Sequence, residues 1–296
     1  MTAKFNRIAV LGRHDDEQVA ELLHALVRHL TKASIEVLAP AALAHDLDVE
    51  RVDESSIAND ADLVIAIGGD GTMLYAAKIA GGRDVPLLGI NRGRLGFLAD
   101  VSPDEMVATV DQILAGQYAV ESRLMLDAVI THADGERVTA TALNDIVLQR
   151  RDTGRMLDVV ARLDGQYVNT HSGDGLIVAT PTGSTAYSLS CGGPIVEPGL
   201  EAIVIAPICP HTLTDRPIVI PSTRRIDLKI LEREDTSAEV VVDGHSIGAI
   251  EPDGELSVTM SPYRARLIHP PGYDFFGLLR SKLFWGRDSR VRNVDV

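Results

Sequence analysis

A glycine-rich run with a single carboxylate, Gly68–Thr72, has the residue types best suited to chemistry in this chain. It lies between the apolar segment Leu63–Ile67 and the helix-like segment Met73–Lys78. Glycines at such a turn let the backbone approach a charged ligand, and consecutive backbone N–H groups can then bind phosphate oxygens. Asp70 would repel phosphate if it were only structural, so we expect it to accept a proton from an attacking hydroxyl or to help hold a metal ion. An ordinary turn also uses Gly and Asp, and that alternative stays open at this point.

A second motif, Asn91–Leu98, has the same strand-to-loop position after the apolar segment Val85–Ile90. The carboxyl ends of neighbouring parallel strands face one crevice, where open α/β sheets bind their ligands. The two motifs are therefore expected to line a common site. The alternative for Asn91–Leu98 is a loop with two turn glycines and a core phenylalanine.

Two further polar motifs lie later in the chain. Asn144 and Asp145 interrupt the strand-like segment Ala142–Leu148, although both residue types are depleted in strands. They indicate either an edge bulge or recognition of hydroxyls or base edges. The run Ser172–Pro194 leads from a buried strand into a hydroxyl-rich turn and a short helix. Its hydroxyls around Gly183 are expected to bind sugar or phosphate groups, whereas simple helix capping would need only one of them.

Several familiar reaction chemistries are missing from the sequence. It contains neither a G-x-x-x-x-G-K-[ST] phosphate loop nor a G-x-G-x-x-G fingerprint. The nine histidines lack the spacing of zinc ligands, and Ser184 does not lie in a G-x-S-x-G nucleophile elbow.

The composition favours small ligands over polyanions. The chain has 296 residues and a net charge of −14, which makes non-specific binding to nucleic acid or to an anionic membrane unfavourable. Cys191 and Cys209 are its two cysteines, too few for a disulfide framework and suited to a reducing cytosol. The first residues do not resemble a signal peptide, and no segment approaches the ~18 apolar residues that span a bilayer. We expect a soluble, cytoplasmic protein with no nucleic-acid or membrane partner.

Residues 1–120 alternate strand and helix patterns, which predicts an α/β domain with a mostly parallel sheet. The expected strands are Arg7–Gly12, Ile35–Leu38, Leu63–Ile67 and Val85–Ile90. One helix is expected from Asp15 to Leu30. Another is expected from Pro103 to about Ala115, with Ser102 as its cap and Glu105 completing a capping box.

Residues 121–265 contain short strand-like segments separated by Asp-Gly turn pairs, which predicts a mainly antiparallel β domain. The expected strands are Leu124–Thr131, Thr139–Leu148, Leu157–Leu163, Leu176–Ala179, Ile203–Ala206, Ile226–Leu231, Ala238–Val242 and Arg264–Ile268. The pair Asp243-Gly244 is interpreted as a hairpin turn with no function of its own. We expect the C-terminal segment 266–296, which is apolar and aromatic in part, to pack back on the first domain.

Together, the four motifs resemble the motif set of the ATP-dependent NAD kinases in order and spacing. The segment Ile268–Pro271 is similar to that of the proteobacterial members. The Gly68–Thr72 run alone is shared with related lipid kinases and, in a similar form, with phosphofructokinases. The Asn144-Asp145 pair and the Thr180–Gly193 stretch favour an NAD kinase.

The resemblance implies a reaction. The γ-phosphate of ATP would pass to the 2′-hydroxyl of the adenosine ribose of NAD, giving NADP and ADP. A divalent metal ion, with Mg²⁺ the expected one, would take part. The family fold is an α/β N-terminal domain followed by a β-rich C-terminal domain, and the family usually assembles as homo-oligomers, either dimers or tetramers.

The resemblance also implies roles for individual residues. Asp70 matches the proton acceptor and lies in the NAD site with Gly71 beside it, and Phe97 lines the pocket. The other implied NAD contacts are Asn144, Asp145, Arg155, Asp174, Thr185, Ala186, Tyr187, Ser188, Leu189, Ser190 and His245. The phosphates of ATP would be bound by Gly68, Gly69, Gly71 and Thr72, and no residue is assigned as a metal ligand.

This chain departs from the family pattern at three positions. Asp145 stands where many members have Glu, His245 where some have Gln, and Ser172 where some relatives have a basic residue. The shorter side chain of Asp145 still accepts a hydrogen bond, with less reach. Ser172 lacks the positive charge that a basic residue offers to a phosphate.

Two other functions stay open at this point. One is a kinase of the same superfamily that acts on a lipid or a sugar phosphate. The acidic balance and the lack of an amphipathic basic helix argue against a lipid, and a sugar phosphate leaves Asn144-Asp145 and Thr180–Ser190 unexplained. The other is a non-catalytic dinucleotide-binding regulator, which would need the glycine run but not Asp70. Binding of NAD without turnover of ATP would distinguish the regulator.

Overall fold

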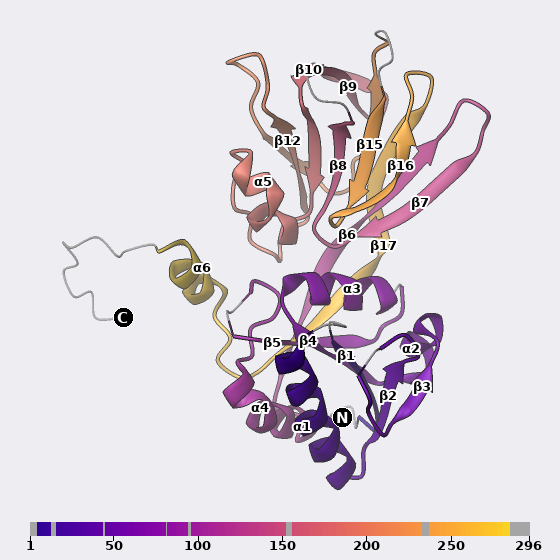
Figure 1. Cartoon of the computed structure of the whole chain (residues 1–296). Coiled ribbons are helices and arrows are strands. Elements are labelled where there is room, and N and C mark those ends of the chain that lie inside the picture. Colours follow the sequence, from indigo (N-terminus) through magenta and orange to yellow (C-terminus); the bar gives the residue numbers. More distant parts are fainter. Residues whose placement is uncertain are drawn as a thin grey trace, which may run out of the picture.

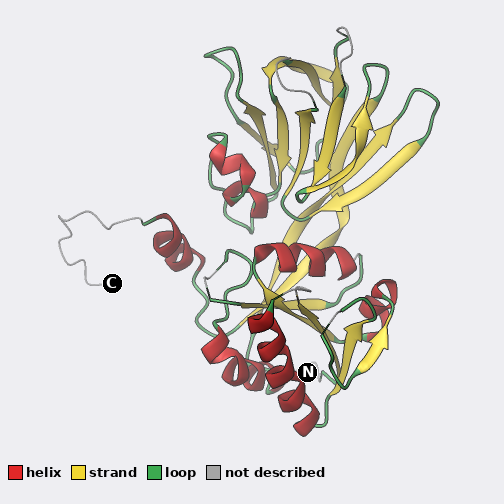
Figure 2. Cartoon of the chain, viewed as in Figure 1, coloured by secondary structure: helices red, strands yellow, loops and turns green. Residues whose placement is uncertain are grey.

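The computed structural model describes residues 5–12, 16–43, 45–80, 82–93, 96–151, 156–232 and 237–284. Its N-terminal part is a layer of parallel strands with helices on both faces (Figures 1 and 2). The strands are β1 (Arg7–Gly12), β2 (Glu36–Pro40), β3 (Glu50–Val52), β4 (Leu63–Gly68) and β5 (Pro86–Asn91), in the spatial order β5-β4-β1-β2-β3. This order reverses between β1 and β4, the position at which open α/β sheets bind their ligands.

The helices cover the two faces of this layer because the strand residues alternate between them. The helices are α1 (Glu17–Lys32), α2 (Glu54–Asp60), α3 (Asp70–Ala80) and α4 (Met106–Leu114), the last preceded by the 3₁₀ turn η1 (Pro103–Glu105). Leu63, Ile65 and Ile67 of β4 pack with the apolar faces of α1 and α4. Val64 and Ala66 pack with α2 and α3 on the opposite face. Within the described ranges, no helix is both long and apolar enough to cross a membrane.

The rest of the chain is mainly antiparallel and forms two packed sheets. The strands are β6 (Ala119–Thr131), β7 (Arg137–Ala142), β8 (Asp145–Arg150), β9 (Leu157–Leu163), β10 (Gln166–Gly173), β11 (Gly175–Ala179), β12 (Ala202–Ile208), β13 (Ile218–Pro221), β14 (Ile226–Ile230), β15 (Ala238–Val242), β16 (His245–Ile250) and β17 (Glu255–His269). One sheet has the order β13-β12-β11-β8-β15-β16. The remaining antiparallel strands, β6, β7, β9, β10, β14 and β17, belong to the same sheet as the parallel strands. Leu126, Ile146 and Leu228 belong to the core between the sheets.

One strand, β17, belongs to both parts. It pairs antiparallel with β14 and β6, and at its end Arg266 and Leu267 pair in parallel with Pro86 and Leu87 of β5. A continuous sheet therefore links the parallel and antiparallel parts (Figure 1). The predicted fold class is confirmed, whereas the domain boundaries near residues 120 and 265 remain predictions. A last helix, α6 (Phe275–Leu283), follows β17.

Short elements are where the structure differs most from the sequence prediction. The strand β3 has three residues and the helix α2 has seven, and neither was expected. Both are too short to show a clear periodicity. The strands β10, β13 and β16 were missed as well, and the segment expected as one strand over 139–148 is two strands, β7 and β8.

Helix starts also differ from the prediction. The helix α3 begins at Asp70 and not at Met73. Ser102 makes no side-chain cap to the backbone; its hydroxyl donates instead to the Glu105 carboxylate at 2.8 Å. The two expected members of the capping box thus bond to each other, and the chain enters α4 through a 3₁₀ turn.

Candidate active site

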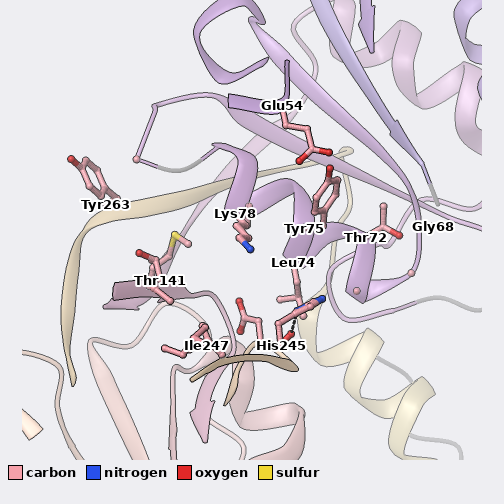
Figure 3. Close-up of a pocket in the computed structure, with 18 of the residues that line it drawn as sticks. Glu54, Gly68, Thr72, Leu74, Tyr75, Lys78, Thr141, His245, Ile247 and Tyr263 are labelled. Atoms are coloured by element: carbon pink, nitrogen blue, oxygen red, sulfur yellow. Dashed lines mark hydrogen bonds between the residues drawn. The ribbon is translucent and has the colours of Figure 1, made fainter. Parts of the chain in front are cut away.

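A cavity of about 990 Å³ opens where the parallel layer faces the antiparallel strands (Figure 3). Gly12 ends β1 and Gly68 ends β4, and both residues line the cavity. From the antiparallel part, β7 contributes Thr141, and β16 contributes His245 and Ile247. The volume suits a nucleotide-sized ligand, and the position is the strand-order reversal described above.

The glycine run forms the N-terminus of α3. Because the helix begins at Asp70, Gly71 and Thr72 lie in its first turn. The first turn of a helix has backbone N–H groups without intrahelical partners, and these attract anions. A β-carbon on Gly69 or Gly71 would have no atom within 4 Å, so the backbone there is open to a ligand. Gly68 instead packs tightly, since its β-carbon would lie 2.1 Å from Oγ1 of Thr72.

The carboxylate of Asp70 is held by the second motif. It accepts backbone N–H bonds from Phe97 at 2.9 Å, Leu98 at 2.9 Å and Ala99 at 3.3 Å. A β-carbon on Gly96 would lie 1.8 Å from Oδ1 of Asp70. The two motifs therefore meet, as their positions after neighbouring parallel strands predict.

Asp243 positions the Asn144-Asp145 pair. Its carboxylate accepts backbone N–H bonds from Leu143 at 2.8 Å, Asn144 at 2.8 Å and Asp145 at 3.2 Å. Asn144 lies in the turn between β7 and β8, and Asp145 is the first residue of β8. The interpretation of Asp243 as a turn residue without further function is therefore incomplete.

A smaller cavity of about 260 Å³ adjoins the large one. Its lining includes Asn144, Asp145, Ala186 and Tyr187. Leu74 lines both cavities, so the region predicted to bind triphosphate and the region predicted to bind a dinucleotide are neighbours.

The electrostatic environment of Asp145 is unusual. Asp145 is buried, with 6% of its surface exposed. Burial, together with the negative charge of Asp243, raises the pKa of Asp145 to about 7, although a hydrogen bond from the backbone N–H of Tyr187 opposes this shift. Asp145 therefore changes charge near neutral pH, and its ability to accept a hydrogen bond from a ligand changes with it.

The hydroxyl-rich turn is largely structural. The hydroxyl of Thr180 donates to the Leu143 carbonyl at 2.6 Å and accepts from the Gly183 N–H at 3.0 Å. The hydroxyl of Ser184 donates to the Pro181 carbonyl at 2.6 Å and accepts from the Val196 N–H at 2.9 Å. The predicted ligand role therefore does not hold for the side chains of Thr180 and Ser184. Both are fully buried, and they shape the backbone of the turn.

Several other predicted contact residues lie in this turn and in the short helix that follows it. The 3₁₀ helix η2 (Thr182–Thr185) and the short helix α5 (Tyr187–Ser190) contain Thr185, Tyr187, Ser188, Leu189 and Ser190, with Ala186 between them. Asp174 lies between β10 and β11, and its Oδ1 is 3.1 Å from Nε of Arg150. Phe97 is half-buried, with the Lys282 ammonium of α6 5.9 Å from its ring centroid. Arg155 lies outside the described residues.

Two cations of the large cavity were not among the predicted site residues. Lys78 of α3 points its ammonium into the cavity and forms no salt bridge within the described residues (Figure 3). Arg92 follows β5 and pairs with Asp16, the residue that caps α1. Lys78 follows Asp70 by eight residues, slightly more than two helical turns, and that spacing on a predicted helix is the signal that would have found it.

A metal ion at this site would be bound mainly by the phosphates of the substrate. The described residues contain no group of three or more His, Cys, Asp or Glu side chains placed to hold a metal. Mg²⁺ does not require such a cage, because it keeps several waters and is usually bound by substrate phosphates with one or two carboxylates. Asp70, at the glycine turn, is a carboxylate that fits this arrangement.

Family models match both parts of the chain. Residues 8–118 match a model described as the ATP-NAD kinase N-terminal domain, and residues 143–270 match the ATP-NAD kinase C-terminal domain. Together the two matches cover more than half of the chain.

Full-length relatives agree with this assignment. The chain is 41% identical to an NAD kinase of Halorhodospira halophila over 289 residues, which are 95% of this chain and 94% of the relative. It is 41% identical to an NAD kinase of Aromatoleum aromaticum over 295 residues, 98% of this chain and 97% of the relative.

Solved structures have the same fold. An NAD kinase from Archaeoglobus fulgidus in complex with ATP has a TM-score of 0.75 and 29% identity, covering 94% of this chain and 98% of that one. A yeast NADH kinase complexed with NADH has a TM-score of 0.91, covering 98% of this chain and 90% of that one; at 23% identity it shows the fold alone. By its domain matches and its close relatives over nearly its whole length, the chain belongs to the ATP-NAD kinase family.

Proposed function

We propose that this chain is an ATP-dependent NAD kinase, which transfers the γ-phosphate of ATP to the 2′-hydroxyl of the adenosine ribose of NAD and gives NADP and ADP. The observation that carries the proposal is the position of Asp70 at the glycine turn of α3, with its carboxylate held by Phe97, Leu98 and Ala99. Family membership and the adjoining cavities support the choice of ATP and NAD as substrates.

The phosphates of ATP bind at the N-terminus of α3. The open backbone at Gly69 and Gly71 brings N–H groups to the phosphate oxygens, with Gly68 and Thr72 completing the turn. Lys78 adds a positive charge on the same helix. Phosphoryl transfer needs mainly positioning and charge stabilisation, which is what these groups provide.

NAD binds across the smaller cavity and the neighbouring turn. Asn144 and ionised Asp145 offer an amide and a carboxylate to the hydroxyls of NAD. The side chain of Ser188 is fully buried, like those of Thr180 and Ser184. The remaining contacts come from Thr185, Ala186, Tyr187, Leu189, Ser190, His245, Asp174, Arg155 and Phe97. Buried Thr180 and Ser184 keep the turn in shape.

Asp70 accepts the proton of the ribose hydroxyl as the bond to phosphorus forms. A ribose hydroxyl is a weak nucleophile at neutral pH, and a positioned general base typically contributes about 10²- to 10⁴-fold in rate. A divalent ion, Mg²⁺ the first choice, neutralises charge on the phosphates when bound.

The composition and the family resemblance support an inference about the cellular compartment, the partners and the oligomeric state of the protein. The net charge of −14 and the two cysteines support a cytoplasmic protein with no nucleic-acid or membrane partner. We infer a homo-oligomer, either a dimer or a tetramer, and light scattering on the purified protein tests it.

The direct test of the activity supplies purified protein with ATP, Mg²⁺ and NAD and detects NADP with an NADP-specific dehydrogenase. Diacylglycerol and fructose 6-phosphate serve as competing acceptors. NADP that forms only when NAD is present supports the proposal. Phosphate transfer to another acceptor would show that NAD is not the substrate. Binding of NAD without turnover of ATP would favour the non-catalytic dinucleotide-binding regulator.

A further inference from the structure

A set of charged side chains, most of them buried, lies between the loop that binds Asp70 and the turn of the predicted NAD contacts. Its centre is His269, the last residue of β17, which is 2% exposed. Nδ1 of His269 lies 2.8 Å from Oδ2 of Asp100, and Nε2 lies 3.1 Å from Oε2 of Glu121. The imidazole also stacks on the ring of Tyr273, with centroids 3.8 Å apart.

On one side, this set of side chains ends at Asp100, next to the backbone that binds the carboxylate of Asp70. Asp100 directly follows Phe97–Ala99, whose N–H groups bind Asp70. The side chain of Asp100 is 9% exposed, so it has little freedom to bond elsewhere. The Asp100–His269 bond therefore anchors the residue that directly follows the backbone bound to Asp70.

On the other side, the chain reaches the NAD-binding turn. Oε2 of Glu121 also accepts a hydrogen bond from the Arg123 guanidinium at 2.7 Å. Arg123 is itself 2% exposed and donates to Oγ1 of Thr182 at 3.3 Å. Thr182 begins η2, the element that leads into residues 185–190.

The charge of His269 decides whether this connection is complete. A neutral imidazole has one N–H and can donate to one carboxylate, whereas an imidazolium donates to both. The groups that face the ring are Asp100 from the loop after β5, Glu121 with its partner Arg123 from β6, and Tyr273 from the segment after β17. Burial lowers the pKa of His269, but the hydrogen bonds and negative charges of Asp100 and Glu121 outweigh burial and raise it above the ordinary value.

We propose that His269, as an imidazolium bridging Asp100 and Glu121, is a positioning residue that sets Asp70 against the NAD-binding turn. This rests on the proposed NAD kinase activity. The nucleophile of NAD is held by the antiparallel part and the base by the parallel part, so their relative placement must be kept. A misplacement of about 1 Å in such an arrangement costs about 10²-fold in rate.

The kinetic test uses His269→Gln, which keeps a donor for one carboxylate and removes the positive charge. We expect kcat to fall about 10- to 100-fold with the KM values for NAD and ATP nearly unchanged. The pH profile gives a second readout. Wild-type kcat should fall as pH rises through the raised pKa of His269, because the imidazolium is the bridging form, and this alkaline limb should be absent in the variant.

A matched control is available in His171→Gln. His171 is 6% exposed and its Nδ1 lies 2.7 Å from Oδ2 of Asp215, so it is another buried His–Asp pair. Within the described part of the chain, no hydrogen bond or ion pair joins His171 to Asp100, Glu121, Arg123 or His269. We expect His171→Gln to lower the melting temperature, as His269→Gln does, but to keep the wild-type kcat and the alkaline limb.

Amide hydrogen exchange tests the positioning without relying on activity. In His269→Gln, the amides of Phe97–Ala99 should exchange faster than in wild type, and in His171→Gln they should not. Asp100→Asn, which leaves His269 in place, should produce the same faster exchange, and the double variant should exchange no faster than the single ones.

The possible results distinguish failure of the positioning role of His269 from failure of the proposed NAD kinase activity. Unchanged exchange at Phe97–Ala99 in His269→Gln overturns the positioning role, whatever the activity. If wild type makes NADP and both histidine variants lose kcat equally, the loss is a general effect of a broken buried pair, and the positioning role is again overturned. If wild type makes no NADP, the proposed function fails, while hydrogen exchange still decides the role of His269.

Discussion

A β-carbon on Gly96 would lie 1.8 Å from Oδ1 of Asp70, so the carboxylate occupies the space that any larger residue would need. The same carboxylate accepts backbone N–H bonds from the three residues that follow Gly96, namely Phe97, Leu98 and Ala99. Glycine is required here by close approach to a side chain, and the contact joins two motifs that lie far apart in the sequence.

Gly96→Ala should therefore displace Asp70 and slow the reaction. We expect kcat to fall about 10²-fold, the cost of a misplacement on the order of 1 Å. NADP formation under saturating ATP and NAD measures it. Gly199→Ala is the control, because a β-carbon there would have no atom within 4 Å. A Gly96→Ala enzyme with wild-type kcat would show that the contact does not position Asp70.

The pKa of Asp145 predicts how NAD binding depends on pH. Burial first, and then the charge of Asp243, raises this pKa to about 7. If ionised Asp145 accepts a hydrogen bond from NAD, affinity for NAD should rise as pH rises through about 7. Asp243→Asn removes the neighbouring charge, so the rise should move to lower pH. Titration of NAD affinity between acid and alkaline pH measures both profiles.

Asp164→Asn provides the matched control for this prediction. Asp164 has a φ of 49° and is followed by a glycine of positive φ, the same turn geometry as Asp243 and Gly244. It lies on the turn between β9 and β10, away from both cavities. An NAD affinity that does not change as pH rises through about 7 would separate Asp145 from NAD recognition.

Ser184→Ala should separate structure from ligand contact. Its hydroxyl is fully buried and bonds to Pro181 and Val196. Its loss removes the partner of the Val196 N–H, whereas the Pro181 carbonyl keeps the bond from the backbone N–H of residue Ser184. We expect the free energy of unfolding to fall by about 1–3 kcal/mol, with the KM for NAD little changed. Denaturant unfolding and steady-state kinetics measure the two effects. A large rise in the KM for NAD with wild-type stability would restore a ligand role for this hydroxyl.

Lys78→Met keeps the aliphatic stem and removes the charge that points into the cavity. Hydrogen bonds to charged groups contribute about 1.5–3 kcal/mol, so the KM for ATP should rise about 10- to 100-fold. The KM for NAD should change less. Lys32→Met, on the exposed last turn of α1, is the control. Equal ATP kinetics in the two variants would remove Lys78 from the ATP site.

The sequence predicted the parts of the site that depend on local pattern. Gly68–Thr72 and Asn91–Leu98 each follow a buried parallel strand, and neighbouring parallel strands end at the same edge of a sheet. Their meeting at Asp70 could therefore be inferred before any coordinates. The fold class followed for the same reason, because alternation of strands and helices and runs of short strands are local signals.

The parts that depend on distant contacts could not be predicted. Asp243 is 99 residues from Asn144, and only the fold brings its carboxylate to that N–H group. Burial of Thr180 and Ser184 likewise depends on packing, so their hydroxyls resembled ligand groups in the sequence. The link from Asp100 to His269 spans 169 positions and has no local pattern at all.

The variant Asp70→Asn tests whether Asp70 accepts the proton of the ribose hydroxyl. An amide has about the shape of the carboxylate but is a far weaker base. NAD affinity is measured by titration and kcat by NADP formation, in the same preparations. We expect a kcat about 10²- to 10⁴-fold below wild type with NAD affinity nearly unchanged. A kcat close to that of wild type would contradict it.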